Sequence, residues 1–228
     1  MRIGVLGTGM VGRALSGKLA ELGHDTRIGT RDVASAMANT EAARDGSGTL
    51  AEWAARTPDV QVATFEEAAA HGEAVFNATA GMASLDALRM AGEKNLDGKV
   101  LIDVSNPLDF SRGFPPSLAV CNTDSLAEQI QVTFPGARVV KTLNTVGAHI
   151  MIGPGNLAGG DHAMFVAGND QEAKTFVADG ILRDGFGWKR VLDLGDLRAA
   201  RGMEMYLPLW LSLMQANGTA MFNIAVVT

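Results

Sequence analysis

Cysteine is almost absent from this 228-residue chain, which contains only Cys121. One cysteine cannot form an intramolecular disulfide, and chains without disulfides are typical of a reducing cytoplasm. No histidine stands near Cys121 in the sequence, so we do not assign it a nucleophilic role. Positive charge is also scarce, because 19 Lys and Arg against 25 Asp and Glu give a formal net charge of −6. Without a basic stripe to neutralise phosphates, the chain is not expected to bind nucleic acid.

Long hydrophobic runs are missing as well. The most apolar stretch, residues 203–227, is interrupted by Pro208 and by the pair Asn217-Gly218. A membrane-spanning helix requires about 20 consecutive apolar residues, so we expect no membrane contact. The N-terminus has no signal-peptide pattern, since Met1-Arg2 leads directly into a predicted strand. These absences together predict a cytoplasmic protein.

Glycine, by contrast, is abundant, with 27 residues, and short apolar segments alternate with helical patterns. This alternation is typical of βαβ units. It predicts an α/β fold of the Rossmann type, with a doubly wound, mostly parallel sheet at residues 1–195 and a small C-terminal helical element at residues 196–228. We expect strands at residues 2–6, 25–30, 60–63, 73–78, 100–104, 138–143, 162–167 and 189–194.

Helices are expected between these strands, with a proline-rich loop at residues 105–116. The helical spacings place them at residues 11–22, 33–43, 50–56, 65–70, 84–91, 125–134, 170–183 and 199–215. The helix at residues 125–134 is expected to begin with Thr123 or Asp124 as its cap.

The first predicted strand runs into a glycine-rich turn that opens the first predicted helix, Gly7-Thr8-Gly9-Met10-Val11-Gly12. Its three glycines permit a sharp bend, a close approach of the backbone to a pyrophosphate, and tight packing of the helix on the strand. The free amides and the dipole at the start of the helix favour negative charge. The turn therefore predicts a dinucleotide site at these six residues.

The end of the second predicted strand indicates which dinucleotide is bound. An NAD site has an acidic residue there, whereas this strand ends in Thr30 and Arg31, and Asp32 comes one or two positions late. A hydroxyl and a guanidinium suit the 2′-phosphate of NADP. We therefore predict NADP as the cofactor. Ser35 and Arg27 either assist this site or are solvated surface residues.

Three further segments follow successive predicted strands, at the carboxyl ends where ligands of open parallel sheets bind. They are small, polar and rich in backbone amides, which suits the lining of a nicotinamide ring. The residues assigned to cofactor binding in these segments are Thr79, Ala80, Asn106, Pro107, Asn144, Thr145, Val146 and Ala148.

A dehydrogenase that acts on an alcohol needs a general acid–base, usually His, Lys or Tyr. The only tyrosine is Tyr206, and none of the histidines has a paired carboxylate in the sequence. Lys141 and His149 are the remaining candidates, although Lys141 fits a structural ion pair equally well. We therefore assign no catalytic residue and, without clustered ligands, no metal. This favours direct hydride transfer between two rings, which needs orientation more than proton transfer.

The chain resembles the NADPH-dependent reductases of the deazaflavin coenzyme F-420 over nearly its whole length. The resemblance lies in residues 1–12, in Leu22-Gly23-His24, in Gly29-Thr30-Arg31, and in the closing segment 192–201 with Glu204 and the apolar helix after it. It implies hydride exchange between NADPH and the central ring carbon of the deazaflavin F-420, and our leading hypothesis is a deazaflavin (F-420) or flavin-type acceptor. It also implies a homodimer, in which the C-terminal helix contributes to the interface and to the acceptor cleft.

Two segments, residues 103–106 and 139–146, are more similar to the cytoplasmic NADPH-oxidising domain of the STEAP metalloreductases. Those proteins continue into transmembrane helices, which we do not expect in this sequence. NADPH binding follows from either resemblance, whereas the identity of the acceptor does not. Two other functions stay open: a non-catalytic NADP-sensing module, and a conventional alcohol or imine dehydrogenase that uses Lys141 or His149.

Overall fold

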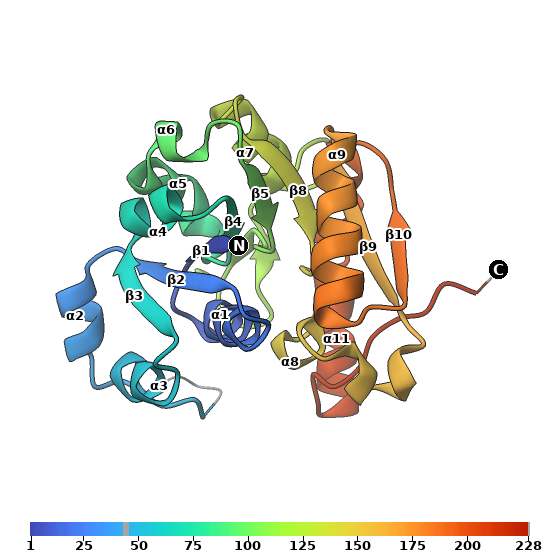
Figure 1. Ribbon diagram of the computed structural model, residues 1–228. Helices are drawn as coiled ribbons and strands as arrows, with labels where there is room; N and C mark the ends of the chain where they lie inside the picture. The colour runs from blue at the N-terminus through green and yellow to red at the C-terminus, as the bar shows by residue number, and fades with distance from the viewer. Residues whose placement is uncertain (43–45, 228) are drawn as a thin grey trace.

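The computed structural model describes residues 1–42 and 46–227, and this part of the chain forms an eight-stranded sheet (Figure 1). The strand order is β10-β9-β8-β5-β4-β1-β2-β3. All neighbours pair in parallel except β8 and β9, so that β9 and β10 run opposite to the rest. The predicted Rossmann-type, doubly wound, mostly parallel sheet is therefore confirmed. The strands are β1 (Arg2–Leu6), β2 (Asp25–Thr30), β3 (Val60–Thr64), β4 (Ala74–Asn77), β5 (Val100–Asp103), β8 (Arg138–Thr142), β9 (Ala163–Gly168) and β10 (Arg190–Asp193).

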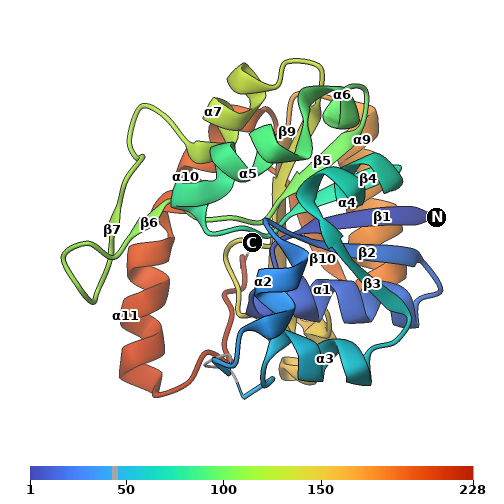
Figure 2. The same ribbon diagram turned by 90° about the vertical axis from the view of Figure 1, so that its left-hand side faces the viewer.

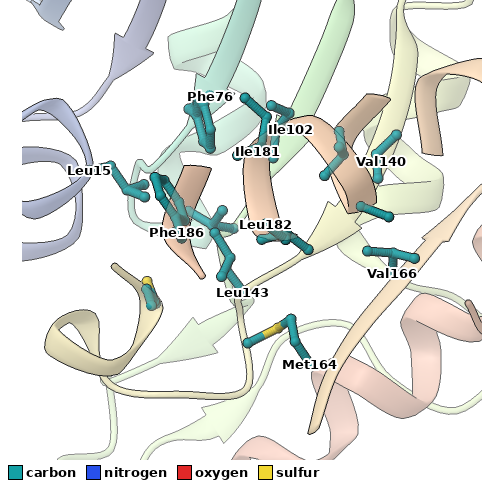
Figure 3. Packing of buried hydrophobic residues seen from close by; sticks show 14 of the residues in the cluster. Leu15, Phe76, Ile102, Val140, Leu143, Met164, Val166, Ile181, Leu182 and Phe186 are labelled. Atoms are coloured by element: carbon teal, nitrogen blue, oxygen red, sulfur yellow. The ribbon is translucent and has the colours of Figure 1, made fainter. Parts of the chain in front are cut away.

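Helices cover both faces of the sheet because side chains of successive strand residues point to opposite faces. In β5, Ile102 packs in one buried cluster and Leu101 in another. Figure 3 shows the first cluster, in which Ile102 lies with Leu15 of α1 and Phe186. That face is covered by α1 (Met10–Glu21), α8 (Ala148–Met151) and α9 (Gln171–Thr175), the last continued by a π-helical segment (Phe176–Phe186).

The opposite face and the β3 edge carry the remaining helices of the sheet domain. Leu6, Leu101 and Val139 belong to the second cluster, and a third, smaller cluster beyond β2 includes Ile28 and Trp53. The opposite face is covered by α4 (Phe65–His71), α5 (Ser84–Ala91), α6 (Glu93–Leu96) and α7 (Leu126–Thr133). The third cluster lies under α2 (Val33–Ala38) and α3 (Leu50–Arg56).

The strand order reverses between β1 and β4. From β1 the chain proceeds outward through β2 and β3, and from β4 it proceeds through β5 and β8 on the other side. Ligands of open parallel sheets bind beyond the carboxyl ends of the strands at such a reversal. The Ala78 N–H, just after β4, donates to the carbonyl of Leu6 at the end of β1 (2.9 Å), so the two loops that follow lie together.

The proline-rich loop at residues 105–116 is not irregular throughout, and that expectation was wrong. β6 (Leu108–Asp109) pairs antiparallel with β7 (Ser117–Leu118). Proline prevents strand pairing only where its missing N–H is required, and the prolines of this loop flank the paired residues instead of occupying them. Figure 2 shows this hairpin extending from the same side of the molecule as α11 (Leu207–Asn217).

Two predicted helices end at other residues than expected. The helix at residues 33–43 stops at Ala38, where Asn39 adopts an extended conformation and its Oδ1 accepts the Glu41 N–H (2.9 Å). Such an Asx turn competes with the helix for the backbone; Ala43 itself lies outside the described residues. The helix at residues 170–183 instead becomes π-helical after Thr175 and continues to Phe186. It ends at Gly187, whose φ of 85° suits a helix terminus.

The predicted C-terminal helix at residues 199–215 is broken. It consists of a 3-10 turn (Leu197–Ala199), α10 (Ala200–Met205) and α11. Pro208, in the first turn of α11, has no N–H with which to continue the hydrogen bonds of α10. After α11 the chain returns to the sheet, where the Ala163 N–H donates to the Ile224 carbonyl (3.0 Å). No helix of the described residues is long and apolar enough to cross a membrane.

Local capping also differs from expectation at α7. Ser125, and not Thr123 or Asp124, caps this helix, because its Oγ accepts the Glu128 N–H (3.1 Å). The short helices α6 and α8 and the 3-10 turns at Gly81–Ala83, Pro154–Asn156 and Ala158–Gly160 were not predicted. Elements of three or four residues show too little periodicity to be recognised in a sequence.

Candidate functional site

The glycine-rich turn has the backbone geometry that its sequence predicts. Gly7 has a φ of 111°, and a Cβ on it would lie 2.6 Å from the Ala78 carbonyl oxygen. A Cβ on Gly12 would overlap the carbonyl oxygen of Gly7. Any side chain at these two positions would therefore push α1 away from the ends of β1 and β4.

The start of α1 is open to a ligand. Gly9 is the N-cap residue, no side chain caps the helix, and its first turn holds no acidic residue. A Cβ on Gly9 would meet no atom within 4 Å. The first helical bond is donated by the Arg13 N–H to the Gly9 carbonyl (3.0 Å), so the amides of Met10, Val11 and Gly12 have no acceptor within the helix. This arrangement fits the diphosphate of a dinucleotide.

Arg13 holds the glycine-rich turn in place through hydrogen bonds, a role that was not predicted from the sequence. It is buried, and its Nε donates to the Thr8 carbonyl (2.8 Å), while its Nη1 donates to Ser47 Oγ (3.1 Å) and to the Gly48 carbonyl (2.8 Å). Arg56 donates to the Ser47 carbonyl from the other side (2.5 Å). The segment before α3 is thereby fixed against the phosphate turn. A lone arginine directly after Gly12 is the only signal that the sequence offers for this role.

The end of β2 presents the predicted phosphate-reading residues. Thr30 is buried at the strand end, and Arg31 is exposed. Among residues 1–42 and 46–227, the Arg31 guanidinium has no hydrogen bond or ion pair, so it is available to an anion. Asp32 is engaged in capping α2, since its Oδ1 accepts the Ser35 N–H (2.7 Å). This hydrogen bond lowers the pKa of the Asp32 carboxyl group. Ser35 itself is exposed, and Arg27 lies in the middle of β2, away from the strand end.

The three predicted ring-lining segments lie at one edge of the sheet, because β4, β5 and β8 are parallel neighbours. Two asparagines join the second and third segments: Asn106 Nδ2 donates to the Asn144 carbonyl (2.9 Å) and Asn144 Nδ2 to Asn106 Oδ1 (3.0 Å). The first segment is tied to the strand ends through the Thr79 hydroxyl, which donates to Asn77 Oδ1 (2.7 Å). The members Ala80, Pro107 and Ala148 lie in the same three segments.

Two buried polar atoms in the third segment are without a partner among the described residues. They are Asn144 Oδ1 and Thr145 Oγ1, on side chains that are each 2% exposed. Burying an unpaired polar atom costs about 1–3 kcal/mol, so such atoms mark places where a ligand or a bound water completes the hydrogen bonding. Val146, the next residue, supplies an apolar side chain that is also buried.

Directly beneath these segments lies a buried charge network centred on Lys141. Its Nζ is 2.7 Å from Asp103 Oδ2 and 2.8 Å from Glu204 Oε1, and it donates to the Ser105 carbonyl (2.6 Å). Burial alone would lower the pKa of Lys141, but the charges of Asp103 and Glu204 outweigh that effect, so the pKa is raised. All three protons of its ammonium group have acceptors, and its side chain is buried. Lys141 therefore cannot serve as the general acid–base for a substrate.

His149, the other acid–base candidate, is exposed on α8. It lines a cavity of about 430 Å³ together with Met10, Arg13 and Trp53. The lining residues come from α1, α3, α8 and adjacent turns, and none belongs to the segments after β4 or β5. The structure therefore places His149 beside α1 and not among the predicted ring-lining residues.

The comparisons with known proteins identify the family. A sequence profile described as "NADP oxidoreductase coenzyme F420-dependent" matches residues 2–107. A crystal structure from Arthrobacter sp. FB24, provisionally described as an F420-dependent NADP reductase, is 51% identical, with each chain covered completely and a TM-score of 0.94. The chain belongs to the F420-dependent NADP oxidoreductase family. The resemblance seen in the sequence is thus confirmed, and the protein is an NADP-dependent oxidoreductase.

More distant structures share the fold of this F420-dependent NADP oxidoreductase family member. A hypothetical protein from Sinorhizobium meliloti is 23% identical over 88% of this chain and 87% of its own, with a TM-score of 0.65. A reductive aminase from Aspergillus terreus, in complex with NADPH and ethyl levulinate, is 16% identical over 95% of this chain and 62% of its own, with a TM-score of 0.62. No curated protein matches the sequence significantly.

Proposed function

We propose that this oxidoreductase exchanges a hydride between NADP(H) and a deazaflavin, coenzyme F-420, or a flavin-type acceptor. The observation that carries the proposal is the relative at 51% identity with the description of an F420-dependent NADP reductase. The overall exchange moves one hydride from NADPH to the acceptor, which also takes up one proton from water. NADP⁺ and the two-electron-reduced acceptor result.

On the nucleotide side, the residues of the turn Gly7–Gly12 hold the diphosphate through the amides of Met10, Val11 and Gly12. The unpaired guanidinium of Arg31 and the hydroxyl of Thr30 hold the 2′-phosphate. Ser35, one turn into α2, is a weaker contributor because its backbone N–H already serves the Asp32 cap. The charge of Arg31 supports NADP over NAD.

On the ring side, Asn144 and Thr145 supply the buried unpaired oxygens that a carboxamide requires. Thr79, Ala80, Asn106 and Pro107 line the ring from the ends of β4 and β5, and Val146 and Ala148 from the segment after β8. Bound NADPH supplies a hydride from its nicotinamide ring. These small, uncharged side chains orient the ring and exclude water, and no side chain of the group has to move a proton.

The acceptor side is assigned to the C-terminal segment, residues 196–228, as distinct from the NADP-binding residues 1–195. Its last residue, Thr228, lies outside the described residues. Leu209 on α11 and Phe110 and Phe114 on the β6–β7 hairpin are each more than half exposed, and Figure 2 shows the hairpin and α11 on the same side of the molecule. Apolar side chains that gather on one exposed face mark an interaction surface. We propose that a second copy of the chain covers this apolar surface, and light scattering on the purified protein measures the resulting mass.

The proposal is tested by following NADPH consumption with F-420, FMN, FAD and a ferric chelate in parallel. Fast turnover with F-420 or a flavin supports it. Tight NADPH binding without turnover of any acceptor would instead support a non-catalytic NADP-sensing module. Carbonyl and imine substrates are assayed in the same way, and exclusive turnover of these would support a conventional dehydrogenase.

A further inference from the structure

We infer that Glu204 is a positioning residue that fixes the ring-lining segments through Lys141. The inference rests on the proposed function, because it assumes that the nicotinamide ring lies on Asn106 and Asn144. Glu204 comes from α10, more than sixty positions after the strand that carries Lys141, yet its carboxylate lies in the same buried network.

The Glu204 carboxylate is held rigidly at both oxygens. Oε1 pairs with Lys141 Nζ (2.8 Å) and accepts the Ala127 N–H (3.2 Å), and Oε2 accepts the Leu126 N–H (2.8 Å). These two amides open α7, where the helix dipole favours a negative charge. The side chain is 1% exposed, so water does not compete for these contacts.

Lys141 connects the Glu204 carboxylate to the ring-lining segments. It donates to the Ser105 carbonyl, which directly precedes Asn106, and it pairs with Asp103 at the end of β5. Asp103 Oδ1 in turn accepts from Asn77 Nδ2 (2.8 Å), and Asn77 Oδ1 accepts from the Thr79 hydroxyl. Two of the three segments are therefore reached from Glu204 by an unbroken series of polar contacts, all of them buried except the last, at the partly buried Thr79.

The residue beside Glu204 reaches the third segment. The Met203 carbonyl accepts from Asn144 Nδ2 (3.0 Å), the amide whose Oδ1 stays without a partner among the described residues. Neighbouring residues of α10 thus contact the segment after β8 directly, through Met203, and the segment after β5 through Lys141. A displacement of α10 would shift Asn106 and Asn144 together.

The composition of the network indicates a role beyond stability. It contains two carboxylates and one ammonium group, all with at most 1% side-chain exposure. Buried charges of this kind are commonly no more stabilising than apolar side chains of similar volume, and in some proteins they instead specify one geometry. In this protein the specified geometry is that of the proposed ring site.

The test compares E204Q with a matched control, E128Q. Glu128 also joins α7 to α10, through an ion pair with Arg201 (2.6 Å), but it has no contact with Lys141. In each protein we measure the affinities for 2′,5′-ADP and for NADPH, the fluorescence lifetime of bound NADPH, and kcat and KM with the best acceptor. The fluorescence arises from the reduced nicotinamide ring and requires no acceptor.

For E204Q we expect affinities for 2′,5′-ADP and NADPH within about threefold of wild type, a shortened lifetime of bound NADPH, and a kcat lowered at least about tenfold. For E128Q we expect wild-type values. Should E204Q fail to fold, E204D carries the same test, since it keeps the charge but withdraws the carboxylate by one methylene; its kcat and lifetime should also fall.

A Glu204 variant that folds and keeps the wild-type fluorescence lifetime of bound NADPH and the wild-type kcat would overturn the inference. An equal loss in E128Q would overturn it as well, because any loosening of α10 would then suffice. If no acceptor is turned over but the lifetime changes as expected, the proposed hydride transfer fails and the positioning role of Glu204 stands.

Discussion

Lys141 and Glu204 form an ion pair at 2.8 Å in which neither side chain is accessible to solvent. One belongs to β8 in the sheet and the other to α10 near the C-terminus. Their contact joins the C-terminal helices to the edge of the sheet where we propose that the nicotinamide ring binds. The Rossmann-type sheet and the C-terminal helices therefore depend on each other at the proposed site.

Replacing Arg31 with Ala should weaken NADPH binding about ten- to a hundredfold, since a charge-assisted contact contributes about 1.5–3 kcal/mol. NADH binding should change little. The dissociation constants of both nucleotides, measured by fluorescence titration, check this. Arg89→Ala is the control, because Arg89 is exposed and pairs with Asp86 on α5, away from the end of β2. Equal weakening of NADPH and NADH would show that Arg31 does not read the phosphate.

Gly12→Ala should destabilise the fold by about 1–3 kcal/mol and impair NADPH binding, because its Cβ would overlap the Gly7 carbonyl. Gly17→Ala in the same helix should stabilise by up to about 1 kcal/mol, since a Cβ there meets no atom within 4 Å. Urea unfolding of both variants measures the two free energies. A neutral Gly12→Ala substitution would contradict the close packing of α1 on β1.

Lys141→Met should destabilise by about 3–5 kcal/mol at neutral pH, because it leaves two buried carboxylates without a counter-charge. Lys174→Met provides the comparison, since Lys174 is also buried but its partner Asp193 is partly exposed. Water can solvate Asp193, so that loss should be about 1 kcal/mol. Similar losses of unfolding free energy in both variants, measured by urea unfolding, would contradict the larger destabilisation expected for Lys141→Met.

The pH dependence of stability offers a separate test of the network. The folded protein raises the pKa of Lys141 above its ordinary value of 10.5, so the charged form is favoured by folding. The corresponding stabilisation is fully present below that pH and is lost as the pH rises through the folded pKa. Urea unfolding of wild type should show this additional loss in the alkaline range, and Lys141→Met should lack it. If the free energy of unfolding changed with pH in the same way in both proteins, the raised pKa of Lys141 would be contradicted.

Much of the fold could be predicted because its signals are local. The strand and helix patterns around the turn Gly7–Gly12 extend over contiguous residues, and the eight predicted strands are all present. The break before α11 was missed although Pro208 was visible, because the apolar stripe around it continues. The β6–β7 pairing was missed because only two residues of each strand take part.

The charge network could not be predicted, because its members are distant in sequence and the segments that contain them do not show which side chains meet. Lys141 lies in β8 between Val140 and Thr142, and the sequence allowed either an ion pair or a catalytic role. Only the fold brings Asp103 and Glu204 to it. Arg13 is a similar case, since the partners that define its role, Ser47 and Gly48, belong to a separate segment. The assignment of individual residues to cofactor binding stays a prediction.

The central claim is direct hydride transfer between NADPH and a deazaflavin or flavin. It is tested most directly with NADPH deuterated at the transferable position of the nicotinamide ring, reacted in ordinary water with F-420, because the central ring carbon of a deazaflavin keeps the deuterium whereas a flavin nitrogen exchanges it with water. The account predicts that one deuterium per NADPH consumed is recovered in the reduced F-420, as determined by mass spectrometry. Deuterium released into water in this reaction, or no reaction with F-420 or any flavin, would contradict it.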